Sequence, residues 1–195
     1  RDHYQPIFRQ LNNIDLEVLN KKEEIAKKLF MNQGITFTVY NENEDGIERI
    51  FPFDIIPRII TSSEWNFLEI GVAQRLKALN LFLKDIYNQQ NIINDGILPA
   101  SLIVSCPHYN REVFGIQVPY DIYVHIAGID LVRDSDGTYY VLEDNLRTPS
   151  GISYMLKNRE VTKRIFPELI IENNVKKVSN YPFLLQIILI SLAPK

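Results

Sequence analysis

Residues 122–145 read IYVHIAGIDLVRDSDGTYYVLEDN. The runs Ile122 to Val132 and Thr138 to Asn145 are rich in β-branched and aromatic residues, which favour strands. Between them lie the polar residues 133–137, which end in the Asp-Gly pair that is typical of tight turns. The stretch therefore predicts two antiparallel strands joined by a short loop.

The length of that loop decides which side chains of the two strands share a face. If Asp136-Gly137 is a two-residue turn, Asp130 lies directly opposite Glu143. A four-residue loop at 134–137 makes the two carboxylates diagonal neighbours instead. Because strand side chains alternate, both registers put Asp130, Glu143 and Asn145 on one face, whereas a three-residue loop would not.

We expect the other side chains of this face to be mainly apolar: Ile122, Val124, Ile126, Val132, Tyr139 and Val141. Two unpaired carboxylates on such a surface are costly, and a bound divalent cation resolves that cost. Two carboxylates and an amide form a hard oxygen set suited to Mg²⁺, which usually completes its shell with phosphates and water. The alternative is that Glu143 and Asn145 lie at a solvated end of the hairpin.

Residues 146–154, LRTPSGISY, follow the predicted hairpin directly. Arg147 places a guanidinium just beyond the predicted metal ligands. Ser150 or Ser153 could cap a new helix, whose exposed backbone N–H groups would suit an anion. Carboxylates, an amide, an arginine and a helix start, in that order, are the parts needed to hold Mg²⁺-nucleotide and a substrate carboxylate.

Outside this region, hydrophobic spacing predicts helices and further strands. The expected helices are a surface helix from Leu16 to Phe30, a core-facing helix of roughly 25 residues between an N-cap at Ser63 and the exit Asn94-Asp95-Gly96, and a last helix from Phe183 to Leu192. The expected strands are 35–40 and 47–51, joined by a turn at 43–46, and one more at 102–105. Together these patterns predict the α/β (α+β) class, with an antiparallel sheet and packed helices.

Composition narrows the class of protein. The chain has 195 residues, 46% of them hydrophobic, and a formal net charge of −3 without a basic cluster, so nucleic acid is not an expected partner. Its longest apolar run, Phe183 to Leu192, falls short of the ~20 residues that span a bilayer, so no membrane association is expected. The single cysteine, Cys106, has no disulfide or metal-ligand partner, which indicates a reducing, cytoplasmic location.

Asp130 followed by Glu143-Asp144-Asn145 resembles the last motif of ATP-grasp ligases, an Asp on one strand and Glu-x-Asn on the next. The longer strings VHIAGIDLVR and VLEDNLRTPSG resemble the circularly permuted ATP-grasp proteins more narrowly. The same resemblance extends to GITF, PFDIIPR, EW and QRLKALN, at 34–37, 52–58, 64–65 and 74–80. It covers nearly the whole chain and implies a partial ATP-grasp-like architecture.

The resemblance also implies a reaction and a set of roles. In such ligases an acceptor carboxylate takes the γ-phosphoryl group of ATP, and an amine then displaces phosphate from the acyl phosphate to form an amide. Asp130, Glu143 and Asn145 would bind Mg²⁺ at the nucleotide phosphates. Arg147 would contact the phosphate or acyl phosphate as the catalytic residue, and Ser150-Gly151 would bind the substrate carboxylate. The implied cofactors are ATP and Mg²⁺.

Circular permutation moves the usual last motif into the first half of the protein. The nucleotide-binding lysines and the adenine pocket are therefore expected after the region where this sequence ends. We expect residues 1–195 to be the N-terminal portion of such a protein, truncated before its nucleotide-binding lobe. Its expected partners are the missing C-terminal half, ATP, and the carboxylate and amine substrates, and the isolated chain is expected to be inactive.

Two other functions fit parts of the pattern. One is a binding or interaction module that keeps the ATP-grasp-like fold without turnover. The other is a metal-dependent nuclease with Asp on one strand and Glu-x-Lys on the next, but Asn145 stands where that lysine belongs. Arg58 and Arg75 either reach the phosphates or form ion pairs at the surface or core rim, and His108 has no visible partner.

Overall fold

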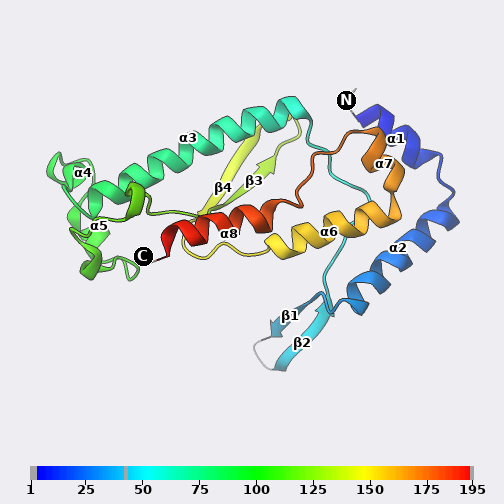
Figure 1. Ribbon diagram of the computed structural model, residues 1–195, viewed down its shortest axis with the longest axis horizontal. Coiled ribbons are helices and arrows are strands. Elements are labelled where there is room, and N and C mark those ends of the chain that lie inside the picture. Colours follow the sequence, from blue (N-terminus) through cyan, green and yellow to red (C-terminus); the bar gives the residue numbers. More distant parts are fainter. Residues whose placement is uncertain (1–3, 42–43, 194–195) are drawn as a thin grey trace. The chain divides into compact units, whose positions relative to one another are not determined.

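The computed structural model describes residues 4–41 and 44–193, which combine helices with small antiparallel sheets (Figure 1). The chain divides into two compact units. Unit 1 contains the residues up to Thr61 and Gly151–Gln186, and unit 2 contains Ser62–Ser150 and the residues from Ile187 onward. The mixed class expected from the sequence is confirmed.

Unit 1 packs its helices around one core. Its elements are α1 (Gln5–Asn12), α2 (Leu16–Asn32), β1 (Thr36–Asn41), β2 (Glu44–Ile50), α6 (Ile152–Ile165) and α7 (Pro167–Glu172). Its buried side chains come from α2, α6, α7 and the junction between the last two: Ala26, Phe30, Val161, Ile165, Phe166 and Leu169. The predicted surface helix is thus confirmed as α2, which Asp15 caps by accepting a hydrogen bond from the backbone N–H of Glu17.

The predicted hairpin of unit 1 is also present, because β1 pairs with β2 in antiparallel fashion. β2 already begins at Glu44, so residues 44–46 belong to the strand and not to the turn expected at 43–46; Asn43 lies outside the described residues. The hairpin base is joined to α6 by Tyr154, whose ring stacks on Phe51 at 4.2 Å and whose hydroxyl donates to the carbonyl of Thr36.

Unit 2 is built along one long helix. Its elements are α3 (Ser62–Ile86), α4 (Asn91–Asn94), α5 (Ala100–Val104), the 3-10 turns η2 (Arg111–Val113) and η3 (Pro119–Asp121), β3 (Gly128–Arg133) and β4 (Tyr139–Asn145). The 25 residues of α3 confirm the predicted length. The helix begins at Ser62, so Ser63 lies inside it and is not the predicted N-cap. The helix ends at Ile86, before the predicted exit.

The core-facing role predicted for α3 holds for only part of its length. Leu68 and Ile86 are buried, whereas Phe67 and Ile70 are 73% and 72% exposed. The buried C-terminal end joins Tyr87 and Ile103 in a second core, where the Tyr87 ring stacks on two other tyrosines.

In unit 2, one strand prediction is wrong, and the prediction for Ile122 to Val132 is confirmed only for its second half, which is β3. The run 102–105 lies largely in α5, because a short apolar run does not by itself distinguish strand from helix, and Ile103 completes the second core from a helical turn. Residues 122–127 form no strand either. There the side chain of Asn80 accepts hydrogen bonds from the backbone N–H groups of Tyr123 and Val124 at 2.8 and 3.0 Å, contacts that a neighbouring strand would otherwise make.

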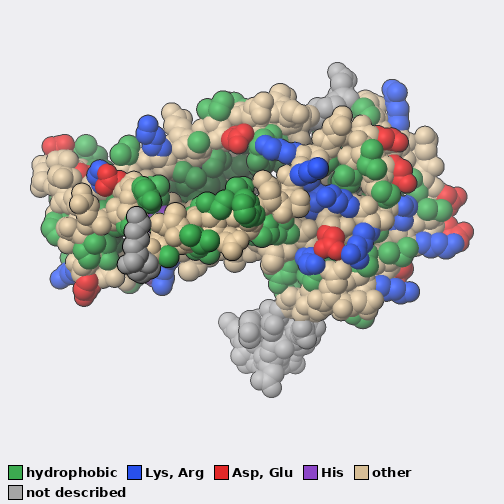
Figure 2. All heavy atoms as spheres, in the orientation of Figure 1, with side chains coloured by type: hydrophobic (Ala, Val, Ile, Leu, Met, Phe, Trp, Pro, Cys, Tyr) green, Lys and Arg blue, Asp and Glu red, His purple; other side chains and the backbone are tan. Residues whose placement is uncertain are grey.

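The predicted last helix is α8 (Tyr181–Leu192), and none of its residues is buried. Several of its apolar side chains are exposed to solvent, among them Phe183 and Ile190, which are 63% and 65% exposed. Figure 2 shows apolar side chains gathered over this helix. No helix among the described residues combines the length and hydropathy needed to span a membrane.

Candidate metal and phosphate site

The loop between β3 and β4 has three residues, the length that by alternation alone would not put Asp130, Glu143 and Asn145 on one face. Arg133 pairs with Tyr139, and the N–H of Asp134 donates to the carbonyl of Thr138 at 2.8 Å. Three residues, 135–137, therefore form the loop, and Gly137 takes a positive φ of 97° that suits glycine. Continued without interruption, this register would put Asp130 and Glu143 on opposite faces.

A β-bulge restores the expected arrangement. Leu131 pairs with Val141 but Asp130 pairs with Glu143, so Leu142 is an extra residue in β4. Beyond the bulge, Asn145 pairs with Gly128. The bulge therefore brings the three predicted ligands onto one face by a route that turn length alone did not indicate.

The same bulge corrects the predicted neighbours of these ligands. Before the bulge, Val132 is paired with Tyr140, so these two side chains share the face of Asp130. Tyr139 and Val141 lie on the reverse face, contrary to expectation, because the extra residue reverses the alternation. Asp130 and Glu143 are exposed, so the predicted cost of burying them on an apolar surface does not apply.

The three side chains are close enough to act together. Directly opposed residues in an antiparallel pair have Cβ atoms about 4.5–5.5 Å apart, which applies to Asp130 and Glu143. The Asn145 amide donates to Oε1 of Glu143 at 2.9 Å, which leaves the amide oxygen available to accept or to bind a cation. Across from Asn145, Gly128 has no side chain, and a Cβ there would lie 3.2 Å from Cβ of Pro149. The glycine thus lets the segment after β4 fold closely over β3.

The electrostatics of this face fit a cation. Two carboxylates directly opposite each other repel, and among the residues that the structure describes neither Asp130 nor Glu143 has an ion-pair partner. Within the same residues, no three His, Cys, Asp or Glu side chains gather where one metal ion could bind. The candidate site on β3 and β4 has only two carboxylates, Asp130 and Glu143, and takes its third oxygen from the amide of Asn145. Two carboxylates with an amide oxygen suit Mg²⁺.

The reverse face of the hairpin is held by α3. Arg75 forms a fork with Asp144, with Nε donating to Oδ1 at 2.7 Å and Nη2 to Oδ2 at 2.6 Å. This guanidinium lowers the pKa of the Asp144 carboxyl, although burial opposes the shift. Glu64 forms a second ion pair with Arg133 on β3. Of the two roles considered for Arg75, the structure shows the ion pair.

Other polar residues of α3 fix the chain that leads into β3. Besides the contacts of Asn80, Lys84 pairs with Asp121 at 2.7 Å, and the Asn88 amide donates to the hydroxyl of Tyr123 at 3.0 Å. The sequence did not indicate the positioning roles of Asn80, Lys84 and Asn88, because the residues next to a polar side chain on a helix do not reveal which distant group it will bind. Only the family-like string that ends at Asn80 singled out part of this surface.

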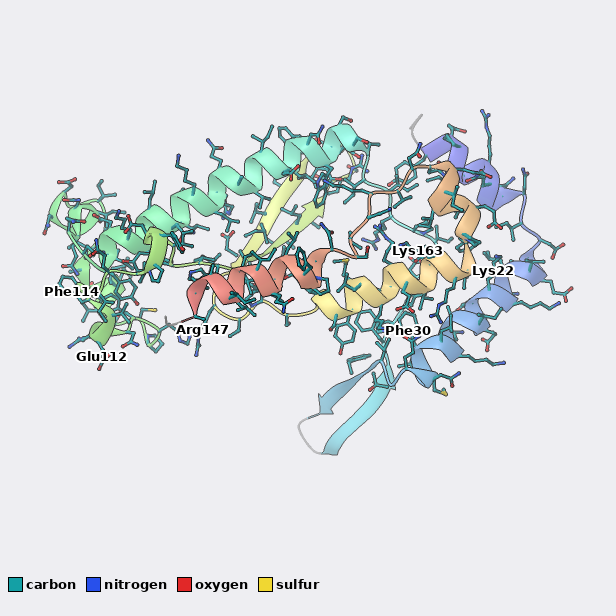
Figure 3. The ribbon with its side chains drawn as sticks, in the orientation of Figure 1. Lys22, Phe30, Glu112, Phe114, Arg147 and Lys163 are labelled. Carbon is teal, nitrogen blue, oxygen red and sulfur yellow. The ribbon has the colours of Figure 1, made fainter. Side chains whose placement is uncertain are left out.

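Arg147 follows the predicted ligands and has an unexpected neighbour. Its Nη1 lies 3.1 Å from Nδ1 of His108, although the sequence indicated no partner for this histidine. Both side chains are exposed. Figure 3 labels Arg147 together with Glu112 and Phe114, which belong to the same unit.

The predicted anion site at the next helix is only partly as expected. α6 begins at Ile152 after Gly151, which has a φ of 88°, and no side chain caps the helix, so neither Ser150 nor Ser153 has the predicted capping role. The boundary between the two units falls between Ser150 and Gly151. Binding of a carboxylate by Ser150-Gly151 stays a prediction.

Comparison with known proteins identifies a matching family and several relatives. A family model described as "A circularly permuted ATPgrasp" matches residues 57–195. An uncharacterized protein of Synechocystis sp. is 46% identical over 194 residues, which are 100% of this chain and 40% of that protein. An uncharacterized Mycobacterium leprae protein is 45% identical over 181 residues, which are 93% of this chain and 31% of that protein.

A third relative carries a functional name. The Frankia casuarinae protein named "Putative glutamate--cysteine ligase 2-2" is 37% identical over 197 residues, which are 100% of this chain and 22% of that protein. The chain thus spans between 22% and 40% of the length of these three relatives. Since the family model covers most of the sequence, including both strands of the candidate site, the chain belongs to the circularly permuted ATP-grasp family.

Proposed function

We propose that this chain supplies the Mg²⁺- and phosphate-binding half of an ATP-dependent carboxylate–amine ligase that works through an acyl phosphate. Membership of the ATP-grasp family supports the use of ATP and Mg²⁺. The Frankia casuarinae relative has a name that includes glutamate–cysteine ligase, which supports a ligase-type reaction.

The observation that carries the proposal is the pairing of Asp130 with Glu143 on an exposed face. We assign the metal to these two carboxylates and the amide oxygen of Asn145. When bound, Mg²⁺ would neutralise charge on the nucleotide phosphates and leave its remaining positions to phosphate and water oxygens. Asp144 is not assigned to the metal, because its carboxylate lies on the reverse face and accepts two hydrogen bonds from Arg75.

Arg147 is the residue we assign to the transferring phosphoryl group. A carboxylate oxygen of the acid would attack the γ-phosphorus, and the bond to the ADP oxygen would break. The amine would then attack the acyl carbon, lose a proton and release inorganic phosphate. A guanidinium two residues beyond Asn145 suits the charge on the phosphate oxygens in both steps. We assign the acid's own carboxylate to Ser150-Gly151.

We infer that the nucleotide-binding lysines and the adenine pocket belong to the remainder of a longer protein. The greater length of the relatives supports this inference. Without the nucleotide-binding lysines, only the residues of this chain would contact the nucleotide phosphates, and solvent would screen these contacts. The carboxylate and amine substrates and the cytoplasmic location belong to the same proposal.

Metal binding can be tested on this chain without turnover. Mn²⁺ can replace Mg²⁺ as a paramagnetic probe, and it should broaden the amide NMR signals of residues 129–131 and 142–146 first. Asp130→Asn and Glu143→Gln should each abolish this selective broadening. Glu112→Gln removes an exposed carboxylate elsewhere in unit 2 and should leave it intact. Selective broadening that survives both site substitutions would refute the metal assignment.

The second candidate is a binding module that keeps the fold without turnover. The observation that favours it is the exposed apolar surface of α8. Steady-state phosphate release by the longest available form of the protein, with acids and amines supplied in pairs, separates the two candidates. Release that requires both substrates supports the ligase, and its absence in a protein that still binds Mg²⁺-ATP supports the module.

A further inference from the structure

We propose that His108 is a positioning residue for Arg147, holding its guanidinium in place for the phosphate group before any ligand binds. This inference rests on the proposed function of Arg147. The observation behind it is the 3.1 Å contact between Nη1 of Arg147 and Nδ1 of His108, which lie 39 positions apart in the chain.

The chemistry of the two groups fixes the direction of this hydrogen bond. A guanidinium carries only N–H donors, so Nδ1 of His108 must accept with its lone pair. His108 is therefore neutral in this contact, with its proton on Nε2. Because the guanidinium is planar, a bond at Nη1 also sets the direction in which the other N–H groups of Arg147 point.

His108 is itself carried on a firmly packed turn. The N–H of Tyr109 donates to the carbonyl of Cys106 at 3.0 Å, and the Tyr109 ring stacks on buried Tyr87 at 5.0 Å. On the other side, the N–H of Asn110 donates to the Tyr87 hydroxyl at 3.1 Å. The second core of unit 2 therefore fixes the backbone on which this exposed histidine stands.

The backbone of Arg147 is fixed from the other direction. It lies between Asn145, which is paired with Gly128, and Pro149, which packs over the same glycine. What remains free is the arginine side chain, whose many rotamers carry a large entropy. A hydrogen bond to His108 reduces that freedom in advance, so less is lost when an anion binds.

The hydrogen bond between His108 and Arg147 is suited to positioning the guanidinium and should contribute little to folding stability. Both side chains are exposed, and exposed polar contacts contribute little to stability. His108→Ala should therefore leave folding nearly unchanged but weaken anion binding through Arg147. His108→Asn should restore binding, because its side-chain oxygen can accept near the position of Nδ1.

The test is an NMR titration of the chain with Mg²⁺-ATP, whose γ-phosphate ADP lacks, followed at the Nε–Hε signal of Arg147 and at the amides of residues 142–146. His108→Ala should weaken binding about three- to tenfold, the effect of one net hydrogen bond. His108→Asn should stay within about twofold of the unsubstituted chain. In the Arg147→Ala background, His108→Ala should have no further effect, because the two residues act as one unit.

Two readouts separate this proposal from the proposed function. Without ligand, His108→Ala should move and narrow the Arg147 Nε–Hε signal, since the side chain gains freedom. Arg111→Ala, which removes another exposed cation of unit 2, should leave that signal in place. If Arg147→Ala binds Mg²⁺-ATP like the unsubstituted chain, the proposed role of Arg147 fails. If Arg147→Ala weakens binding but His108→Ala changes neither binding nor the signal, the positioning role fails.

Discussion

The bulge at Leu142 makes neighbouring residues respond in opposite ways to the same chemical change. Asp144 faces α3 and is paired with Arg75, whereas Glu143 faces solvent opposite Asp130. We predict that Asp144→Asn lowers stability and leaves metal binding within about threefold. We predict that Glu143→Gln abolishes metal binding and leaves stability unchanged or slightly higher.

The size of the first effect follows from the local geometry. The Asp144 side chain is 17% exposed and accepts two charge-assisted hydrogen bonds at 2.7 and 2.6 Å. Removing the charge from such a well-formed but solvent-accessible pair should lower the free energy of unfolding by about 1 kcal/mol for Asp144. In Glu143→Gln, loss of repulsion from Asp130 should raise it by at most about 0.5 kcal/mol.

The pH dependence of the first effect has a defined sign. The pKa of Asp144 is lowered in the folded chain from its ordinary value of 3.8, so its charge stabilises the fold above that pH. This contribution is lost as the pH falls through the lowered folded value. The difference in stability between Asp144→Asn and the unsubstituted chain should therefore be full at pH 7 and shrink below about pH 4.

Urea unfolding followed by circular dichroism measures both stabilities, and Mn²⁺ broadening of the same samples measures the metal site. Lys77→Ala, which removes an exposed cation from α3, serves as the control for a change of surface charge and should have little effect. The reasoning is refuted if Asp144→Asn abolishes metal binding while Glu143→Gln leaves it intact. That result would mean that β4 presents the other set of side chains to the metal.

Three further predictions concern the rest of the chain. Phe30→Ala removes a ring that is 1% exposed in the core of unit 1, and it should lower the free energy of unfolding by about 3–5 kcal/mol in urea titrations. Arg147→Ala in a longer, active form should raise the barrier to turnover by about 3–4 kcal/mol, seen as lost phosphate release, but change stability by only about 0.5 kcal/mol. The isolated chain should release no phosphate from ATP, and a dye for apolar surfaces should bind it; Ile190→Ser in α8, where this side chain is 65% exposed, should reduce the dye signal. Robust turnover by the chain alone, or a dye signal unaffected in Ile190→Ser, would contradict the last prediction.

Local patterns predicted much of this molecule from its sequence. Residue spacing predicted α2, the length of α3, α8 and both hairpins, because helix and strand periods depend on residues a few positions apart. The resemblance at Asp130 and Glu143-Asp144-Asn145 also predicted the residues of the candidate site. These features depend on near neighbours, so the sequence was sufficient to indicate them.

The remaining features depend on residues that meet only when distant segments pack. The extra residue Leu142 puts the candidate ligands on one face, and no local signal distinguishes it from its neighbours in β4. The side chain of Asn80 accepts a hydrogen bond from the backbone of Tyr123, where a strand was predicted. The stacking of Tyr109 on Tyr87 in the second core fixes the turn that places His108 next to Arg147. A side chain's polar groups bond to whatever packing brings near them, so these partners became apparent only in the tertiary structure.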